Sequence, residues 1–200
     1  MSNENIPPLK VFAPGSLIGA SADLASGFMS AFPGVPAPEF QFAMTGKLAA
    51  DLLAGADADV ALFANRFYAE QVYQAGRLDR PRTLAGNRLA LLVRPEMTGE
   101  IAGLMSLAKP GIRVIAFPPD MDPCGAYTAE LFARDGLAGT MAAKGEIGEF
   151  TILGAGTQMN MQEGFTNGAI DVAVVYASLG SIFPGASVIV PLPPEHDMHE

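Results

Sequence analysis

The composition describes a folded, acidic chain. Half of its 200 residues are hydrophobic and 16% are charged, a balance that excludes a disordered protein. The formal charge of −9 argues against a nucleic-acid-binding surface, because such a surface needs a basic stripe. No apolar run reaches the ~20 residues that cross a bilayer, and the single cysteine excludes an internal disulfide.

The first part of the chain alternates between strand-like and helix-like segments. Short apolar runs predict strands, and apolar residues at helical spacing predict helices that stop at glycine or proline. The predicted strands are 9–13, 39–43 and 59–64, the last of them buried on both faces. The predicted helices are 17–32, 48–53 and 66–74. A basic segment at 77–83 then breaks the pattern and marks the approach to a boundary between two lobes.

The same alternation continues in the second part of the chain. The predicted strands are 89–93, 112–117, 150–153, 171–176 and 187–190. The predicted helices are 100–107, 127–134 and 158–165. Strands that alternate with helices predict an α/β fold with mostly parallel sheets flanked by helices.

Two similar turns follow the first two predicted strands. In each, an apolar extended run gives way to small residues and one hydroxyl, Ser16 or Thr45, and then to a helical segment. Helix N–H groups and a hydroxyl directed at one spot suit an anion. The alternative is that both residues are ordinary helix caps, since serine and threonine are preferred at that position.

Two later segments have the same position relative to a strand. Asp122–Tyr127 opens the helix after the strand at 112–117, and Val174–Ser178 places the Tyr176 phenol at the end of another strand. Ligands of open α/β sheets bind beyond the carboxyl ends of the strands. Tyr176 could equally be a half-buried strand aromatic, and Cys124 a small packed residue.

Taken together, these stretches resemble the substrate-binding components of molybdate and tungstate importers. The matching stretches occur in that family's order over roughly residues 9–192, and they are Val11–Leu17, Leu48–Val60, Leu84–Leu89, Pro123–Tyr127 and Val174–Ser178. The resemblance implies a two-lobed type II periplasmic-binding-protein fold. Lobe 1 would span 9–83 and carry the first two turns, lobe 2 would span 84–190, and 191–200 would be a terminal crossing segment or a tail.

The resemblance also implies the ligand contacts. The family's first serine, with its hydroxyl and amide, matches Ser16, and its second serine matches Thr45. A backbone amide of the family falls on Cys124, where alanine is usual, and another falls near Gln158. The family's tyrosine hydroxyl matches Tyr176. No catalytic residue, metal site or cofactor is implied.

Neutral donors of this kind favour a fully deprotonated dianion such as molybdate, tungstate or sulfate. Hydrogen phosphate would also need an acceptor for its proton. The resemblance therefore implies a solute-binding component of an ABC importer that binds molybdate or tungstate between its lobes and delivers it to a permease. We expect a periplasmic protein if a signal peptide has been removed, and a cytoplasmic one otherwise.

Family members continue beyond the point that corresponds to the end of this sequence. We therefore expect a first lobe that lacks its last elements, with either a second copy of the chain covering it or a fold less stable than that of the relatives. The alternatives to an importer component are an intracellular oxyanion sensor or storage protein and a sulfate-type binder. An enzyme with Cys124 as nucleophile is disfavoured, because the only histidines, His196 and His199, lie in the terminal run.

Overall fold

The computed structural model describes residues 6–153, 158–183 and 188–192 of the chain. The chain divides into two compact units, Met1–Thr83 (unit 1) and Leu84–Glu200 (unit 2). Each unit is a sheet flanked by helices, so the α/β class predicted from the alternation of segments is confirmed. Within the described residues, no helix is both long and apolar enough to cross a bilayer.

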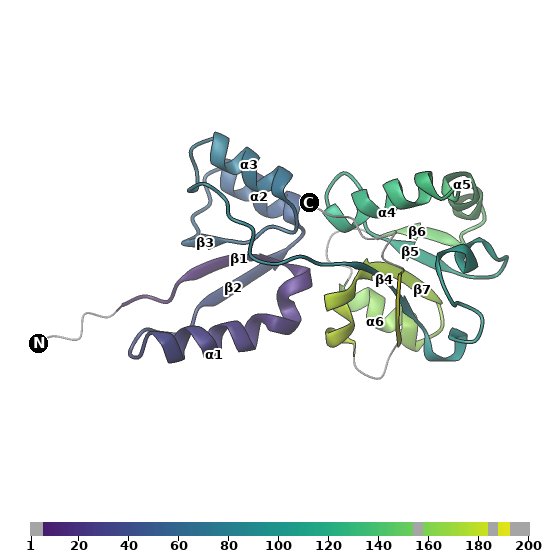
Figure 1. The fold of residues 1–200 in the computed structure, drawn as a ribbon, viewed down its shortest axis with the longest axis horizontal. Helices are drawn as coiled ribbons and strands as arrows, with labels where there is room; N and C mark the ends of the chain where they lie inside the picture. The colour runs from purple at the N-terminus through teal and green to yellow at the C-terminus, as the bar shows by residue number, and fades with distance from the viewer. Residues whose placement is uncertain (1–5, 154–157, 184–187, 193–200) are drawn as a thin grey trace, which may run out of the picture. The chain divides into compact units, whose positions relative to one another are not determined.

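Unit 1 is built on a three-stranded parallel sheet in the order β2-β1-β3. The strands are β1 (Lys10–Pro14), β2 (Glu39–Ala43) and β3 (Val60–Ala61). The helices are α1 (Ser21–Ala31), α2 (Thr45–Leu53) and α3 (Arg66–Gln74), with a 3-10 turn, η1 (Gly15–Ala20), before α1. Figure 1 shows α2 and α3 on one side of this sheet and α1 on the other. Because the strands are parallel, their carboxyl ends share one edge.

The core of unit 1 lies between the sheet and α2 and α3. It is formed by five buried side chains, Phe12, Leu48, Ala49, Leu52 and Val72. Burial of a leucine of this kind contributes roughly 2 kcal/mol. The helix α1 contributes no buried residue to it.

The predicted buried strand at 59–64 is wrong in extent and in burial. Only Val60 and Ala61 pair with β1, and the Val60 side chain is 38% exposed. The reason is its place in the sheet, since β3 is an edge strand with a neighbour on one side only. An unbroken apolar run is therefore compatible with an edge position as well as a covered one.

Unit 2 contains a five-stranded sheet in the order β6-β5-β7-β4-β8. Its strands are β4 (Leu89–Val93), β5 (Val114–Ala116), β6 (Phe150–Ile152), β7 (Val172–Tyr176) and β8 (Val188–Pro191). β5 is parallel to β6 and β7, whereas β4 is antiparallel to β7 and β8. The strand pairs of the chain are thus mostly parallel, as predicted. The exception is β4, which is antiparallel to both of its neighbours.

Helices cover both faces of this sheet. They are α4 (Pro123–Arg134), α5 (Ala138–Glu146) and α6 (Gln158–Thr166), with 3-10 turns η2 (Pro95–Met97), η3 (Leu104–Ala108) and η4 (Ala177–Ile182). Figure 1 shows α4 and α5 on one face and α6 on the other. The predicted helix at 100–107 is wrong, because only η3 forms there, and glycines 99 and 103 interrupt the run. The sequence analysis missed α5, whose glycines weaken its helical pattern.

An ion-pair cluster ties the strands of unit 2 together at the edge where β7 begins. Asp171 is 1% exposed and accepts hydrogen bonds from Arg94 (2.6 Å) and Arg113 (2.8 Å). Burial opposes the charge of Asp171, but the hydrogen bonds from the two arginines outweigh it and lower the pKa of this carboxyl. This cluster lies at the edge opposite to the carboxyl ends of β5 and β7, and it is structural.

The segment that leads from one unit to the other is fastened at both ends. Arg77 Nε donates to the Leu52 carbonyl (2.9 Å), which holds Arg77 on α2 of unit 1. Asn87 Nδ2 donates to Ser178 Oγ (2.9 Å), which holds Asn87 on η4 of unit 2. The chain between these two contacts is the connection between the units.

Candidate functional site

The two candidate hydroxyls of unit 1 follow the carboxyl ends of neighbouring strands. Ser16 lies in η1 directly after β1, and Thr45 is the first residue of α2, just after β2. The register pairs Pro14 with Ala43, so the two turns leave the sheet side by side. Ser16 is half-buried, whereas Thr45 is fully buried.

The Thr45 hydroxyl makes a hydrogen bond within unit 1. Its Oγ1 accepts a hydrogen bond from the Ala64 N–H at 3.3 Å, which links α2 to the loop after β3. A hydroxyl can accept and donate at the same time, so the Thr45 proton remains available as a donor. Neither the Ser16 hydroxyl nor the Thr45 hydroxyl caps its helix, because neither η1 nor α2 has a side-chain hydrogen bond at its N-cap.

Cys124 lies in the first turn of α4, on the loop that follows β5. The helix begins with Asp122 as N-cap and Pro123 at its first position, a combination typical of helix starts. The Cys124 side chain is 1% exposed, and its thiol lies 3.8 Å from the Val174 carbonyl of β7. The structure therefore brings the Cys124 turn and the last part of β7 together.

The backbone N–H of Cys124 already has an acceptor. It donates to Asp122 Oδ1 at 2.9 Å, and the Gly125 amide also acts to lower the pKa of this carboxyl. Burial raises the pKa of Asp122 to about 6, and the hydrogen bonds from the two amides oppose this shift. The sequence analysis named Asp122 only as part of the helix-opening segment and missed its contact with the candidate amide. The Asp-Pro pair is the signal that identifies it as a cap.

Gly125 fixes how closely α4 approaches the strand loop. A Cβ at this position would overlap the backbone of Phe117 and Pro118, so only glycine allows the helix start to pack against this loop. Thr128 Oγ1 donates to the Cys124 carbonyl at 2.7 Å and is itself buried. The first turn of α4 is therefore held rigidly in place.

Tyr176 is the last residue of β7 and is 6% exposed. It pairs with Leu89 at the start of β4, and the next residue, Ala177, donates its N–H to the Arg88 carbonyl at 2.8 Å. Tyr176 thus lies at the same sheet edge as the Cys124 turn. The neighbouring Asn87–Ser178 hydrogen bond was not anticipated, since no periodic signal marks either residue.

Gln158 is the first residue of α6, which follows β6 in the chain. Residues 154–157 lie outside the described part of the structure, so the loop that leads into α6 is not available for comparison with the other turns. β5 is parallel to both β6 and β7, so the carboxyl ends of these three strands share one edge of the sheet. Cys124 and Gln158 follow two of these ends, and Tyr176 forms the third.

The thiol of Cys124 is not suited to nucleophilic chemistry. Burial and the neighbouring Asp122 charge raise its pKa well above the ordinary value, which keeps the thiol protonated. Among the described residues, no group of histidine, cysteine and carboxylate side chains could hold a metal ion. His196 and His199 lie outside the described residues.

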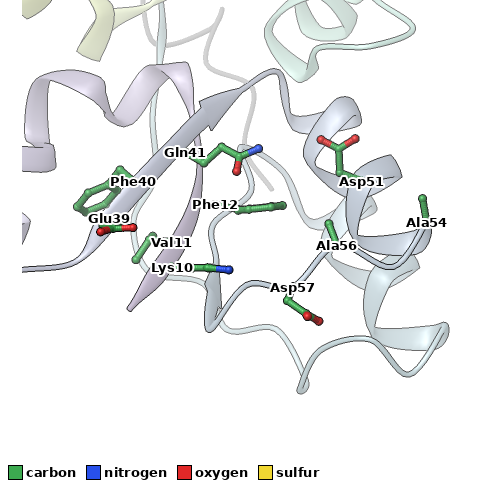
Figure 2. A pocket seen from close by; sticks show the side chains of 10 residues that line it. All are labelled: Lys10, Val11, Phe12, Glu39, Phe40, Gln41, Asp51, Ala54, Ala56 and Asp57. Atoms are coloured by element: carbon green, nitrogen blue, oxygen red, sulfur yellow. The ribbon is translucent and has the colours of Figure 1, made fainter. Parts of the chain in front are cut away.

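A hollow of about 640 Å³ in unit 1 lies away from these turns (Figure 2). It is bordered by Lys10 at the start of β1, Glu39 at the start of β2, and Asp51 and Asp57. Its position is at the amino ends of the strands, opposite to Ser16 and Thr45. With three carboxylates and one amine, this hollow is a poor place for a dianion.

Comparisons with known proteins agree with this architecture. The model of a family described as bacterial extracellular solute-binding protein matches residues 9–199. The molybdate-binding protein ModA of Mycobacterium tuberculosis is 31% identical over 128 residues, which are 64% of this chain and 48% of that protein. ModA of Mycobacterium bovis matches equally well. The chain spans about half the length of these relatives.

Solved structures show the same fold. The periplasmic molybdate-binding protein of Azotobacter vinelandii has a TM-score of 0.71 at 23% identity, and the match covers 94% of this chain and 80% of that one. The sulfate-binding protein SubI of Mycobacterium tuberculosis has a TM-score of 0.72 at 15% identity, over 93% and 71%. The fold is that of the periplasmic binding proteins, and the family model covers nearly the whole sequence. The chain belongs to the family of bacterial extracellular solute-binding proteins.

Proposed function

We propose that this chain binds a tetrahedral oxyanion, molybdate or tungstate, as the solute-binding component of an ABC importer. The observation that carries the proposal is the common position of its five candidate residues. Ser16 and Thr45 follow the carboxyl ends of β1 and β2, Cys124 and Gln158 follow those of β5 and β6, and Tyr176 is the last residue of β7. This is the position at which α/β sheets bind ligands.

The donors in this proposal are all neutral. They are the hydroxyls of Ser16, Thr45 and Tyr176 and the backbone N–H groups at Cys124 and Gln158. Each hydrogen bond to a charged ligand contributes roughly 1.5–3 kcal/mol, so several of them supply useful affinity without a lysine or arginine. In this proposal all five groups donate to the ligand, and such a set of donors favours a fully deprotonated dianion.

The family and the relatives support the transport role. The family is described as extracellular, and the ModA proteins that this chain resembles are named for molybdate. The partner in this proposal is an ABC permease, the location is outside the cytoplasm, and the chain catalyses no reaction. The neutral state of the buried Cys124 thiol supports the last point. An intracellular sensor or storage protein and a sulfate binder are the alternatives.

We also propose that a second copy of the chain covers the apolar surface of unit 1. The support is a group of exposed side chains on and just after α1: Leu24 is 47%, Met29 42% and Phe32 55% exposed. Patches of this kind mark interaction surfaces in soluble proteins. Light scattering of the purified chain is expected to give the mass of a dimer, and the mass of a monomer would contradict this part of the proposal.

Thermal-shift and calorimetric titrations with molybdate, tungstate, sulfate and phosphate test the ligand. A ligand at 100 times its Kd stabilises the folded state by about 2.7 kcal/mol, so selective stabilisation by molybdate and tungstate is expected. Equal effects of all four anions, or none, would count against the proposal. Sulfate alone would favour the sulfate-type binder.

A pair of serine variants tests the site. Ser16→Ala is expected to weaken molybdate binding at least about tenfold, because it removes one charge-assisted hydrogen bond. The matched control is Ser30→Ala, since Ser30 is exposed on α1 and its hydroxyl donates to the Ser26 carbonyl at 2.9 Å. Equal binding by Ser16→Ala and Ser30→Ala would remove Ser16 from the site.

A further inference from the structure

The backbone donors in the first turn of α4 are directed at Asp122. Pro123 has no N–H, the Cys124 N–H donates to Asp122 Oδ1 at 2.9 Å, and the Ala126 N–H donates to the Asp122 carbonyl at 3.1 Å. The carboxylate therefore occupies the position that an anion takes at a helix N-terminus.

The helix start cannot move away to free these amides. Gly125 packs directly against the Phe117 and Pro118 backbone, and Thr128 fastens the Cys124 carbonyl. Asp122 itself is held on the loop by its N–H, which donates to the Pro118 carbonyl at 2.9 Å. The side chain of Asp122 is half-buried rather than enclosed, and a rotation about its own bonds would take it away from the amide.

A carboxylate and an oxyanion exclude one another at these amides. Two unit charges about 4 Å apart repel by roughly 4 kcal/mol at an effective dielectric constant of 20, and an oxyanion carries two charges. A ligand oxygen that accepts from Cys124 must therefore replace the Asp122 oxygen rather than bind beside it. The free energy of the hydrogen bonds to Asp122 is subtracted from the affinity of the ligand.

We propose that Asp122 is an internal competitor of the oxyanion: its carboxylate caps α4 through the Cys124 amide and must leave that amide before the ligand binds there. This inference rests on the proposed function, because it takes the Cys124 amide as one of the ligand's donors. Asp122 lowers the affinity of the site and sets the lowest ligand concentration to which the chain responds. It does so without contacting the bound ion.

Calorimetric titration with sodium molybdate at pH 8 tests this role. Asp122→Asn keeps a side-chain oxygen at the N-cap and removes the charge. A neutral amide oxygen binds the Cys124 N–H more weakly than a carboxylate does and does not repel an oxyanion. We expect the association constant of Asp122→Asn to rise at least about tenfold over the unaltered chain. Asp122→Ser, a second neutral cap, is expected to show the same gain, and circular dichroism verifies that both variants are folded.

The matched control is Asp120→Asn. It removes the same charge from the same loop, and Asp120 is exposed and does not cap α4. Its association constant is expected to stay within about twofold of the unaltered chain, because exposed charges are screened by solvent and salt. An equal gain in Asp120→Asn and Asp122→Asn would reduce the effect to net charge and overturn the inference.

The remaining outcomes separate this inference from the proposed function. If the unaltered chain binds molybdate and the two Asp122 variants bind no more tightly, Asp122 does not compete and the function stands. If the Asp122 variants bind while the unaltered chain does not, both are supported. If no variant binds molybdate, tungstate or sulfate, the proposed function fails and the inference fails with it.

Discussion

Replacing Asp122 by asparagine should stabilise the folded chain in a way that depends on pH. Burial raises the pKa of Asp122 to about 6 from an ordinary value of 3.8. A pKa raised on folding means that the folded state holds its proton more tightly than the unfolded state does. The stability linked to that proton is complete below pH 3.8 and is lost as the pH rises through about 6.

The size of the effect follows from that difference in pKa. At 1.36 kcal/mol per pH unit, the shift corresponds to about 3 kcal/mol, and the partial exposure of the side chain reduces this to about 1–3 kcal/mol. Asp122→Asn keeps the cap without the buried charge. It should therefore be more stable than the unaltered chain by about 1–3 kcal/mol at pH 8 and equal to it near pH 4.

Urea denaturation of both proteins at pH 4, 6 and 8 measures this difference, with Asp120→Asn as the control for net charge. The groups that act on Asp122 are the amides of Cys124 and Gly125, and its titratable neighbour is the Cys124 thiol, which stays protonated over this range. A stability difference that is the same at pH 4 and pH 8 would refute the reasoning. An Asp122 carboxyl that titrates near 3.8 in a carbon-13 NMR experiment would also refute it.

Three further predictions concern unit 2. Gly125→Ala should lower the free energy of unfolding by about 1–3 kcal/mol, because its methyl group would overlap the Phe117 backbone. Gly139→Ala should not lower it, because the space around Gly139 is open. Equal stabilities of the two variants in urea denaturation would contradict this prediction. Asp171→Asn should lower the free energy of unfolding by about 3–5 kcal/mol, since it leaves Arg94 and Arg113 without their carboxylate. Because folding lowers the pKa of Asp171, its contribution to stability is present above the ordinary value of 3.8 and is lost as the pH falls through its lower folded value. An acid titration of the melting temperature tests this sign. The Cys124 thiol should react with iodoacetamide far more slowly in the folded chain than in urea at pH 8, and equal rates would show that it is neither buried nor raised in pKa.

The sequence predicted best those elements whose ends carry local signals. The strands 39–43 and 89–93 and the helix 66–74 have the predicted bounds, and Gly76 lies just beyond that helix in the left-handed conformation that glycine favours. The short strand β3 was overestimated because its length depends on which strands are beside it. The length of β3 is a property of the whole sheet, and the apolar run 59–64 does not specify it.

The site was predictable as a set of positions and not as a set of contacts. Ser16, Thr45 and Tyr176 follow strand ends, as expected from the alternation of strands and helices. The hydrogen bonds between the Asp122 carboxylate and the first turn of α4 depend on side-chain rotation, and residue spacing does not specify rotation. The burial that raises the pKa of Asp122 comes from the packed loop after β5, which only the folded chain brings together.

The connection between the units includes a short stretch of chain that is fastened at both ends. Arg77 is held on α2 by the Leu52 carbonyl, and Asn87 is held on η4 by Ser178, so residues 78–86 are the stretch between these two contacts. A fully extended stretch of this length spans at most about 30 Å, and Pro81 restricts its backbone further. This stretch is therefore short, and its end at Asn87 is bonded to the turn that follows Tyr176.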